Sequence, residues 1–186
     1  MSSEPSTDAQ PSTPDLDAIY EEIQLFRAGF STLSMASISP GGEPEASYAP
    51  YLEADGDLYI FVSALSVHTA NLIETGRVSV LFIEDEATAA HPFVRRRLTL
   101  QCRVDEIARD SDGYEAILDR FETRFGGLVA TLRALADFHL LRLRPERGRY
   151  VKGFGKAFAI DDVGLARVRH IRENGSRAVP GEDTAV

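Results

Sequence analysis

The sequence predicts a mainly β protein, an antiparallel barrel with short helices at its periphery. Six or seven segments are apolar at every second residue or apolar throughout, as strands are when one or both faces are buried. Several of these segments are joined by short turns, such as "PGGEP" and "ADGD", which favours antiparallel neighbours. At 186 residues, the chain has the length of one domain with a single core.

Composition and charge limit the classes of function. Hydrophobic residues make up 44% and charged residues 26% of the chain, the balance of a soluble globular protein. The net charge of −9 disfavours general nucleic-acid binding. No apolar run approaches the roughly 20 residues that span a bilayer. The start, "MSSEPSTDAQPSTPD", lacks the basic and apolar parts of a secretory signal. We therefore expect a cytoplasmic protein without a membrane partner.

The first third of the chain predicts a tail, a helix and three strands. Residues 1–13 are almost free of apolar side chains and are expected to be a disordered tail. A helix should follow, with Thr13 as N-cap and Pro14 at its first position. Its apolar face consists of Leu16, Ile19, Tyr20, Ile23 and Phe26. The period then changes to two, which predicts strands at 31–39, 45–53 and 58–63.

The remaining elements are expected to complete the barrel. A short helix capped by Ser66 should run to Glu74. Strands are predicted at 77–84, 97–107, 137–146 and 149–160, the last two joined by a turn near Gly148. Between them, a helical region at 111–136 is interrupted at Gly126 and Gly127. The barrel domain should thus span 14–160, and the charged extension at 161–186 should be partly disordered.

The common catalytic signatures do not occur in the sequence. The four histidines, His68, His91, His139 and His170, have no metal-site spacing such as HExxH. The nucleotide and serine-hydrolase motifs GxGxxG, GxxxxGK and GxSxG are also missing. A surface or structural role is the commoner one for a lone histidine. The single cysteine, Cys102, lies in an alternating segment and is expected to be a buried core residue.

Two basic clusters could hold an anionic ligand in this acidic chain. They are "HPFVRRR" at 91–97 and "RLRPERGR" at 142–149. If the first enters a strand, Arg95 and Arg97 share a face and Arg96 points away. Such a pair can clamp a carboxylate or phosphate, or it can be a solvated strand edge that resists aggregation. The acidic run at 84–86 is either a set of carboxylates sharing a proton or a solvated loop.

Several stretches, taken in order, resemble one known family. They are "SYAPY", "SVHTANL", "RVSVLFIEDEA", "FVRRRLTL", "RFG" and "ADFHLLRLRPERGRYVKGFGKA". Together, over about residues 20–170, they resemble the HutZ/HugZ family of heme-utilisation proteins, a branch of the pyridoxamine 5'-phosphate oxidase-like, FMN-binding split barrels. The resemblance implies a split β-barrel of six or seven antiparallel strands and a homodimer with heme in a cleft between subunits.

The stretch "SVHTANL" indicates whether the cofactor is heme or FMN. In flavin-binding relatives the matching segment resembles Ser-Arg-Lys, whose two cations hold the FMN phosphate; this chain has Ser66, Val67 and His68 there. The phosphate would lose two charge-assisted contacts worth about 1.5–3 kcal/mol each. We therefore expect heme as the cofactor. The alternative is FMN, bound through Ser66, Asn71 and either Arg95 or Arg97.

The resemblance also implies roles for individual residues. Arg95 and Arg97 are our candidates for the heme propionates. By position, Asp137 matches a family aspartate that hydrogen-bonds the iron-binding histidine of the other subunit. His170 matches the first histidine of the family's C-terminal stretch, and Ser176 stands where the family has its ligand. We therefore expect His170 to bind the heme iron, with His68 as the next candidate.

The implied activity is oxygen-dependent degradation of heme for iron utilisation, with electrons from an external donor. Two alternatives stay open from the sequence. One is an FMN-dependent oxidoreductase of the pyridoxamine-phosphate-oxidase-like type. The other is a heme carrier without catalytic activity.

Overall fold

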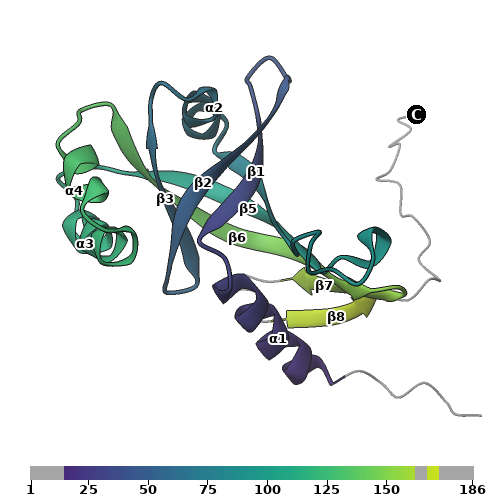
Figure 1. Cartoon of the computed structure of the whole chain (residues 1–186). Helices are drawn as coiled ribbons and strands as arrows, with labels where there is room; N and C mark the ends of the chain where they lie inside the picture. The colour runs from purple at the N-terminus through teal and green to yellow at the C-terminus, as the bar shows by residue number, and fades with distance from the viewer. Residues whose placement is uncertain (1–14, 162–166, 172–186) are drawn as a thin grey trace, which may run out of the picture.

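Eight antiparallel strands form one sheet, six of which close into a barrel. The structure is a computed structural model and describes residues 15–161 and 167–171. The strand order is β3-β2-β1-β4-β5-β6-β7-β8, and β3 also pairs with β6. That extra pairing closes the barrel from β3 to β6, so β7 and β8 extend the sheet beyond it (Figure 1). The predicted split-barrel class is confirmed, with one strand more than the larger of the two expected numbers.

The strands are β1 (Thr32–Ile38), β2 (Pro44–Ala54), β3 (Asp57–Ser63), β4 (Arg77–Ile83), β5 (Arg97–Ile107), β6 (Phe138–Gly153), β7 (Lys156–Asp161) and β8 (Arg167–Ile171). The helices are α1 (Leu16–Ala28), α2 (Val67–Thr75), the 3₁₀ turn η1 (Pro92–Val94), α3 (Tyr114–Phe125) and α4 (Leu128–Arg133). The interruption expected at Gly126 and Gly127 separates α3 from α4. No helix of the described residues is long and apolar enough to cross a membrane.

Three local expectations were wrong. The predicted turn near Gly148 does not occur, because β6 continues through it to Gly153. Gly148 is a glycine for a packing reason: a Cβ there would lie 2.8 Å from Leu100 Cδ2. The N-cap of α1 is Asp15, whose carboxylate accepts from two backbone N–H groups of the first turn, and not Thr13. A strand, β8, lies in the extension at 161–186, where no strand was predicted. Residues 1–13 and most of that extension lie outside the described residues.

Two apolar clusters stabilise the barrel. The larger lies inside it and includes Ile19 and Ile23 of α1, which covers the end near β8. The smaller lies between the outer surface of β2, β3 and β6 and the helix pair α3–α4. At one end of the barrel the buried Arg27 of α1 forms an ion pair with Glu53. Tyr51 donates a 2.7 Å hydrogen bond to the carbonyl oxygen of the same arginine. The helix is thereby attached to the barrel by apolar and polar contacts.

The longest ladder of the sheet joins β5 to β6. It pairs Arg97 with Val151 at one end and Ile107 with Leu140 at the other, with a register shift between Gln101 and Cys102. Because side chains alternate along a strand, one face of this ladder supplies the core and the other points outward. The ladder therefore carries both the stability of the barrel and an outward surface.

Gly148→Ala should destabilise the protein. The added methyl group would meet Leu100 Cδ2 at 2.8 Å and the Thr99 carbonyl oxygen at 2.9 Å. Overpacking of this kind costs about 1–3 kcal/mol of unfolding free energy. Gly127→Ala is the matched control, since a Cβ there meets nothing within 4 Å and the φ angle of −64° is ordinary. Urea unfolding of both variants measures the difference; equal stabilities would contradict the packing argument.

Candidate functional site

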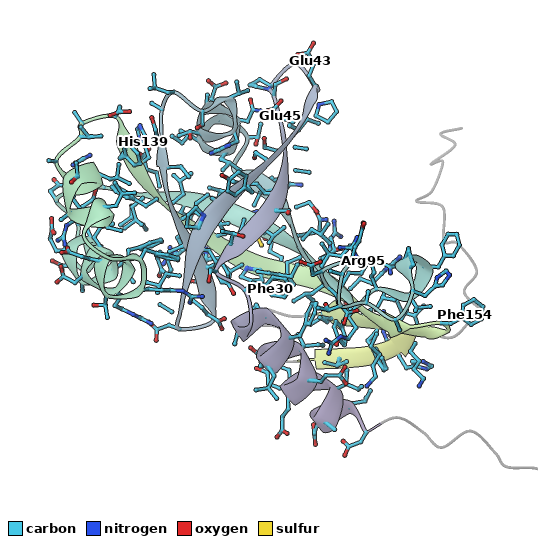
Figure 2. The ribbon with its side chains drawn as sticks, viewed as in Figure 1. Phe30, Glu43, Glu45, Arg95, His139 and Phe154 are labelled. Atoms are coloured by element: carbon cyan, nitrogen blue, oxygen red, sulfur yellow. The ribbon has the colours of Figure 1, made fainter. Side chains whose placement is uncertain are left out.

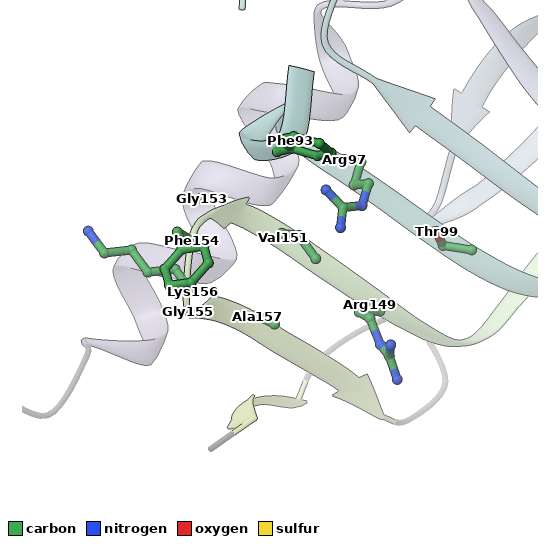
Figure 3. A pocket seen from close by; sticks show the side chains of 10 residues that line it. All are labelled: Phe93, Arg97, Thr99, Arg149, Val151, Gly153, Phe154, Gly155, Lys156 and Ala157. Carbon is green, nitrogen blue, oxygen red and sulfur yellow. The ribbon is translucent and has the colours of Figure 1, made fainter. Parts of the chain in front are cut away.

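A hollow of about 430 Å³ opens on the outward face of β5, β6 and β7 (Figure 3). Its floor follows the cross-strand pairs of the sheet, in which Thr99 pairs with Arg149 and Val151 with Ala157. The residues between them, such as Leu98 and Tyr150, point inward and are fully buried. The alternation of the strands therefore places a different chemistry on each side of the same ladder.

The hollow is positively charged. Arg97, Arg149 and Lys156 line it, and no acidic residue does. Among the described residues none of these three cations forms a salt bridge; Arg97 donates only to the carbonyl oxygen of Arg95, at 3.2 Å. In a chain of net charge −9, this is a local reversal of sign. Such a site attracts carboxylates or phosphates.

Two exposed phenylalanines border the same hollow. Phe93 of η1 is 89% exposed, and Phe154, at the tip of the β6–β7 hairpin, is 91% exposed. Both rings are among the lining side chains, one beside Arg97 and the other at the hairpin (Figure 3). Exposed large aromatic rings next to unpaired cations suit a ligand with a flat apolar body and anionic groups.

A second hollow, of about 620 Å³, adjoins the first and shares Thr99 and Arg149 with it. Arg147, Asp161 and Ile171 contribute to its lining. The two hollows form one groove along the outward face of β5–β7, which we call the outer groove. Its length along the strands gives room for a ligand larger than either hollow.

Arg97 and Arg95 have different surroundings. The expectation that they share a strand face was wrong, because β5 begins at Arg97. Arg95 precedes the strand, donates a 2.7 Å hydrogen bond to the carbonyl oxygen of Glu84 and forms a 2.8 Å ion pair with Glu86. Its guanidinium group is therefore occupied, and it holds the segment 84–95 in place. Only Arg97 of the pair lines the outer groove.

Three other predicted residues gather at α2, away from the outer groove (Figure 1). Asn71 is buried and donates to the hydroxyl of Ser37 at 3.2 Å. Asp137 accepts a 2.6 Å hydrogen bond from Ser63, close to the start of the helix. His68 is half-buried, and its Nε2 atom has no hydrogen-bond partner. Burial lowers the pKa of His68, and the nearby Glu45 opposes that shift. The structure therefore favours a neutral imidazole at this place.

His170 lies on the inward side of β8. It pairs across the strands with the buried Phe158, and the two ring centroids are 5.1 Å apart. The outer groove is on the opposite face. His170 lies at the same level of the sheet as Tyr150, since both pair with Phe158. Tyr150 is 13 residues along the chain from Asp137, which corresponds to about 40 Å of extended strand. One chain therefore does not bring Asp137 and His170 together. Ser176 lies outside the described residues.

The remaining candidates are explained by local contacts. His139 contacts Glu106 at 2.6 Å, and Figure 2 places it far from Arg95 and Phe154. In the acidic run, a hydrogen bond from the backbone of Arg96 lowers the pKa of Glu84, which argues against a shared proton. Cys102 is buried as expected, and burial raises the pKa of its thiol to about 12.

Four residues of the outer groove were not predicted from the sequence: Arg149, Lys156, Phe93 and Phe154. Arg149 belongs to the second basic cluster. Because a turn was expected at Gly148, the sequence did not predict that Arg149 pairs with β5. Once β6 is known to continue to Gly153, the alternation puts Arg149 on the same face as Thr99. The two phenylalanines gave a weaker signal: each follows a chain-bending residue, Pro92 or Gly153, where an exposed ring is unusual.

The free energy of unfolding should decrease as the pH is lowered, because of His68. Its pKa is lowered in the folded state from an unfolded value of about 6.5, so unfolding takes up a proton below that pH. The neutral-histidine contribution is complete above the unfolded pKa and declines as the pH falls below it. His68→Gln should therefore lose less stability than the wild type between about pH 7 and 5.5. Urea unfolding at both pH values tests this; identical declines would contradict it.

Comparison with known proteins agrees with this architecture. The family model "Pyridoxamine 5'-phosphate oxidase" matches residues 19–152. The heme oxygenase HutZ of Vibrio cholerae is 36% identical over 152 residues, covering 82% of this chain and 86% of HutZ. The crystal structure of Campylobacter jejuni ChuZ superposes with a TM-score of 0.78 at 30% identity, covering 89% of this chain and 67% of ChuZ. The crystal structure of HutZ, the V. cholerae heme storage protein, gives 0.67 at 38% identity, covering 73% and 95%. The chain belongs to the HutZ family, within the pyridoxamine 5'-phosphate oxidase-like split barrels.

Proposed function

We propose that this protein binds heme in the outer groove and degrades it with oxygen. The observation that carries the proposal is the set of unpaired cations between exposed aromatic rings on an otherwise acidic chain. Heme has this combination of a flat apolar ring and two carboxylates. Membership of a family with a heme oxygenase and a heme storage protein supports the same ligand.

The residues of the groove fit the chemistry of heme. Arg97 and Arg149 are diagonal neighbours across β5 and β6, because Thr99 opposes Arg149 and Arg97 opposes Val151. Diagonal positions are about 7–8 Å apart, so two guanidinium groups can meet two separate carboxylates. Val151 and Ala157 give an apolar floor, and Phe93 and Phe154 offer ring surfaces at the edge. Bound heme would supply the iron at which oxygen is activated, and the protein would orient it.

FMN fits the described residues less well. A phosphate at the start of α2 would find backbone N–H groups but no cation, because Val67 is apolar and His68 is held neutral. The unpaired cations of the outer groove, Arg97, Arg149 and Lys156, lie instead on β5, β6 and β7, away from α2 (Figure 1). The charge distribution therefore supports heme over FMN as the ligand.

We also propose a homodimer. The outward face of the sheet continues from the groove across β4, β1 and β2, where Thr99, Leu81, Ser34 and Tyr48 form one cross-strand row. These side chains are exposed or half-buried, and three further large apolar side chains, Ile38, Leu65 and Val67, are exposed nearby. A second chain on this face would cover them. Asp137 and His170 lie far apart within one chain, so the contact that the family resemblance implies would need a second chain.

The iron ligand is proposed from the sequence, with His170 first and His68 second; neither residue lines the outer groove of its own chain. Asp137 is proposed as the carboxylate that hydrogen-bonds the ligand and makes it more electron-rich. The electron donor is proposed to be external, since the groove is lined by side chains without redox chemistry. The cytoplasmic location also stays a prediction.

Arg97→Gln and Arg149→Gln should each weaken hemin binding about tenfold, because each removes one charge-assisted contact with a propionate. Titration followed at the Soret band measures the dissociation constant. Arg103→Gln is the matched control: it removes the same charge from β5, but its partner is the exposed Glu146 outside the groove. Equal affinities of all four proteins would place heme elsewhere.

Hemin-loaded protein should lose its Soret band when ascorbate is added in air, whereas a carrier would keep it. His170→Ala should abolish a histidine-ligated spectrum and slow this loss, because the iron would lack its protein ligand. His68→Ala is the parallel variant. If only the His68 variant changes the spectrum, the ligand assignment moves to that residue. A purified protein with flavin absorption and no hemin binding would overturn the proposed function.

A further inference from the structure

His91 is the one histidine of the chain with a contact to a wall of the outer groove. All four histidines are described: His68 lies in α2, His139 contacts Glu106, and His170 faces inward on β8. The ring of His91 stacks on Phe93, with centroids 5.4 Å apart and planes inclined by 26°. Phe93 in turn lines the hollow that contains Arg97. Phe93 thus forms the edge of the groove on this side, and the ring of His91 lies directly beside it.

The hydrogen bond of His91 determines which ring nitrogen carries the proton. His91 is the N-cap of η1, and its Nδ1 atom accepts a 3.2 Å hydrogen bond from the backbone N–H of Phe93. A neutral imidazole has one acceptor and one donor nitrogen. With Nδ1 as acceptor, the proton must be on Nε2. A protonated nitrogen cannot bind iron, but it can donate a hydrogen bond.

The segment that carries His91 is held at both ends. Arg95 binds the carbonyl oxygen of Glu84 and the carboxylate of Glu86, and the backbone N–H of Glu84 bonds to the carbonyl oxygen of Arg96 at 2.8 Å. Within the segment, the backbone N–H of Ala87 donates to Asp85 at 2.8 Å. These contacts limit the movement of the loop. The Nε2–H group is therefore presented from a supported position and not from a free tail.

We propose that His91 contacts the ligand of the outer groove directly, donating a hydrogen bond from Nε2–H to a carboxylate of the porphyrin. This inference rests on the proposed function and adds a residue to it. Arg97 is the first residue of β5 and lines the same hollow as Phe93. His91 and Arg97 would thus hold the anionic edge of the porphyrin with one neutral and one charged donor, while Phe93 packs against its ring.

The test compares His91→Asn with His91→Asp in the full chain. Both side chains keep an oxygen that can cap η1, and they differ only in replacing an amide by an anion. If Nε2–H meets a carboxylate, His91→Asp should weaken hemin binding at least tenfold. His91→Asn should stay within about threefold of the wild type, because its amide N–H can donate in place of Nε2–H. The loss in His91→Asp should shrink between about 0.01 M and 1 M salt, because the Debye length falls from roughly 30 Å to 3 Å.

Two controls separate a contact from a structural or long-range effect. Ala90→Asp places the same charge one residue away on an exposed position and should bind hemin as the wild type does. Hemin dimethyl ester, which lacks the carboxylates, should bind His91→Asp and the wild type equally. Phe93→Ala should weaken both porphyrins, since it removes an apolar wall.

The outcomes are distinguishable. If His91→Asp binds hemin as tightly as the wild type, or loses equal affinity for hemin and its dimethyl ester, the inferred contact is wrong while heme binding stands. If Ala90→Asp loses as much affinity for hemin as His91→Asp does, the effect is long-range electrostatic repulsion, and the inferred contact is again wrong. If the wild type binds neither porphyrin, the proposed function fails and this inference fails with it.

Discussion

The pairing of β5 with β6 is the constraint on which both the core and the candidate site depend. Leu98 and Tyr150 are opposite each other in this ladder and point into the barrel, while their neighbours Thr99 and Arg149 point outward. A shift of one residue would bury Arg149 and expose Tyr150, so the hydrophobic core fixes the register. The same register then fixes which side chains line the groove. The position of the cations is thus a consequence of core packing, and no separate device is needed to hold them.

The strands could be predicted because their alternation is strong, and Arg97 could be placed on an outward face for the same reason. The groove could not, because it depends on where β6 ends. Gly148 resembles a turn residue in the sequence, yet it is a glycine because Leu100 and Thr99 lie against it from the neighbouring strand. Such contacts between residues far apart in the chain leave no local pattern. Arg95 illustrates the same limit: its partners Glu84 and Glu86 are close in sequence, but only the loop geometry decides that it binds them instead of a ligand.

Charge is distributed unevenly in this molecule, and the distribution follows from pairing. Arg95, Arg96 and Arg103 each face an acidic side chain and contribute little net field at a distance. Arg97, Arg149 and Lys156 form no salt bridge among the described residues and lie together. An acidic protein that keeps three cations unpaired in one place forgoes a small gain in stability there. Because isolated surface pairs are worth only about 0–1 kcal/mol each, leaving these cations unpaired costs little stability, and it keeps them available to an anionic ligand.

A phosphate and a heme need different binding surfaces on a split barrel, and the start of α2 differs from the outer groove in the same way. A phosphate is compact, so converging N–H groups at a helix N-terminus suit it when cations lie nearby. At the start of α2 those cations are replaced by Val67 and a neutral His68. Heme has its carboxylates on separate arms and a broad apolar plane, which a flat sheet with spaced cations can match. Arg97 and Arg149, set diagonally on neighbouring strands, have that spacing, and a helix terminus could not provide it. Within this chain, the spaced cations that could meet two carboxylates therefore lie on a different surface of the barrel from the start of α2.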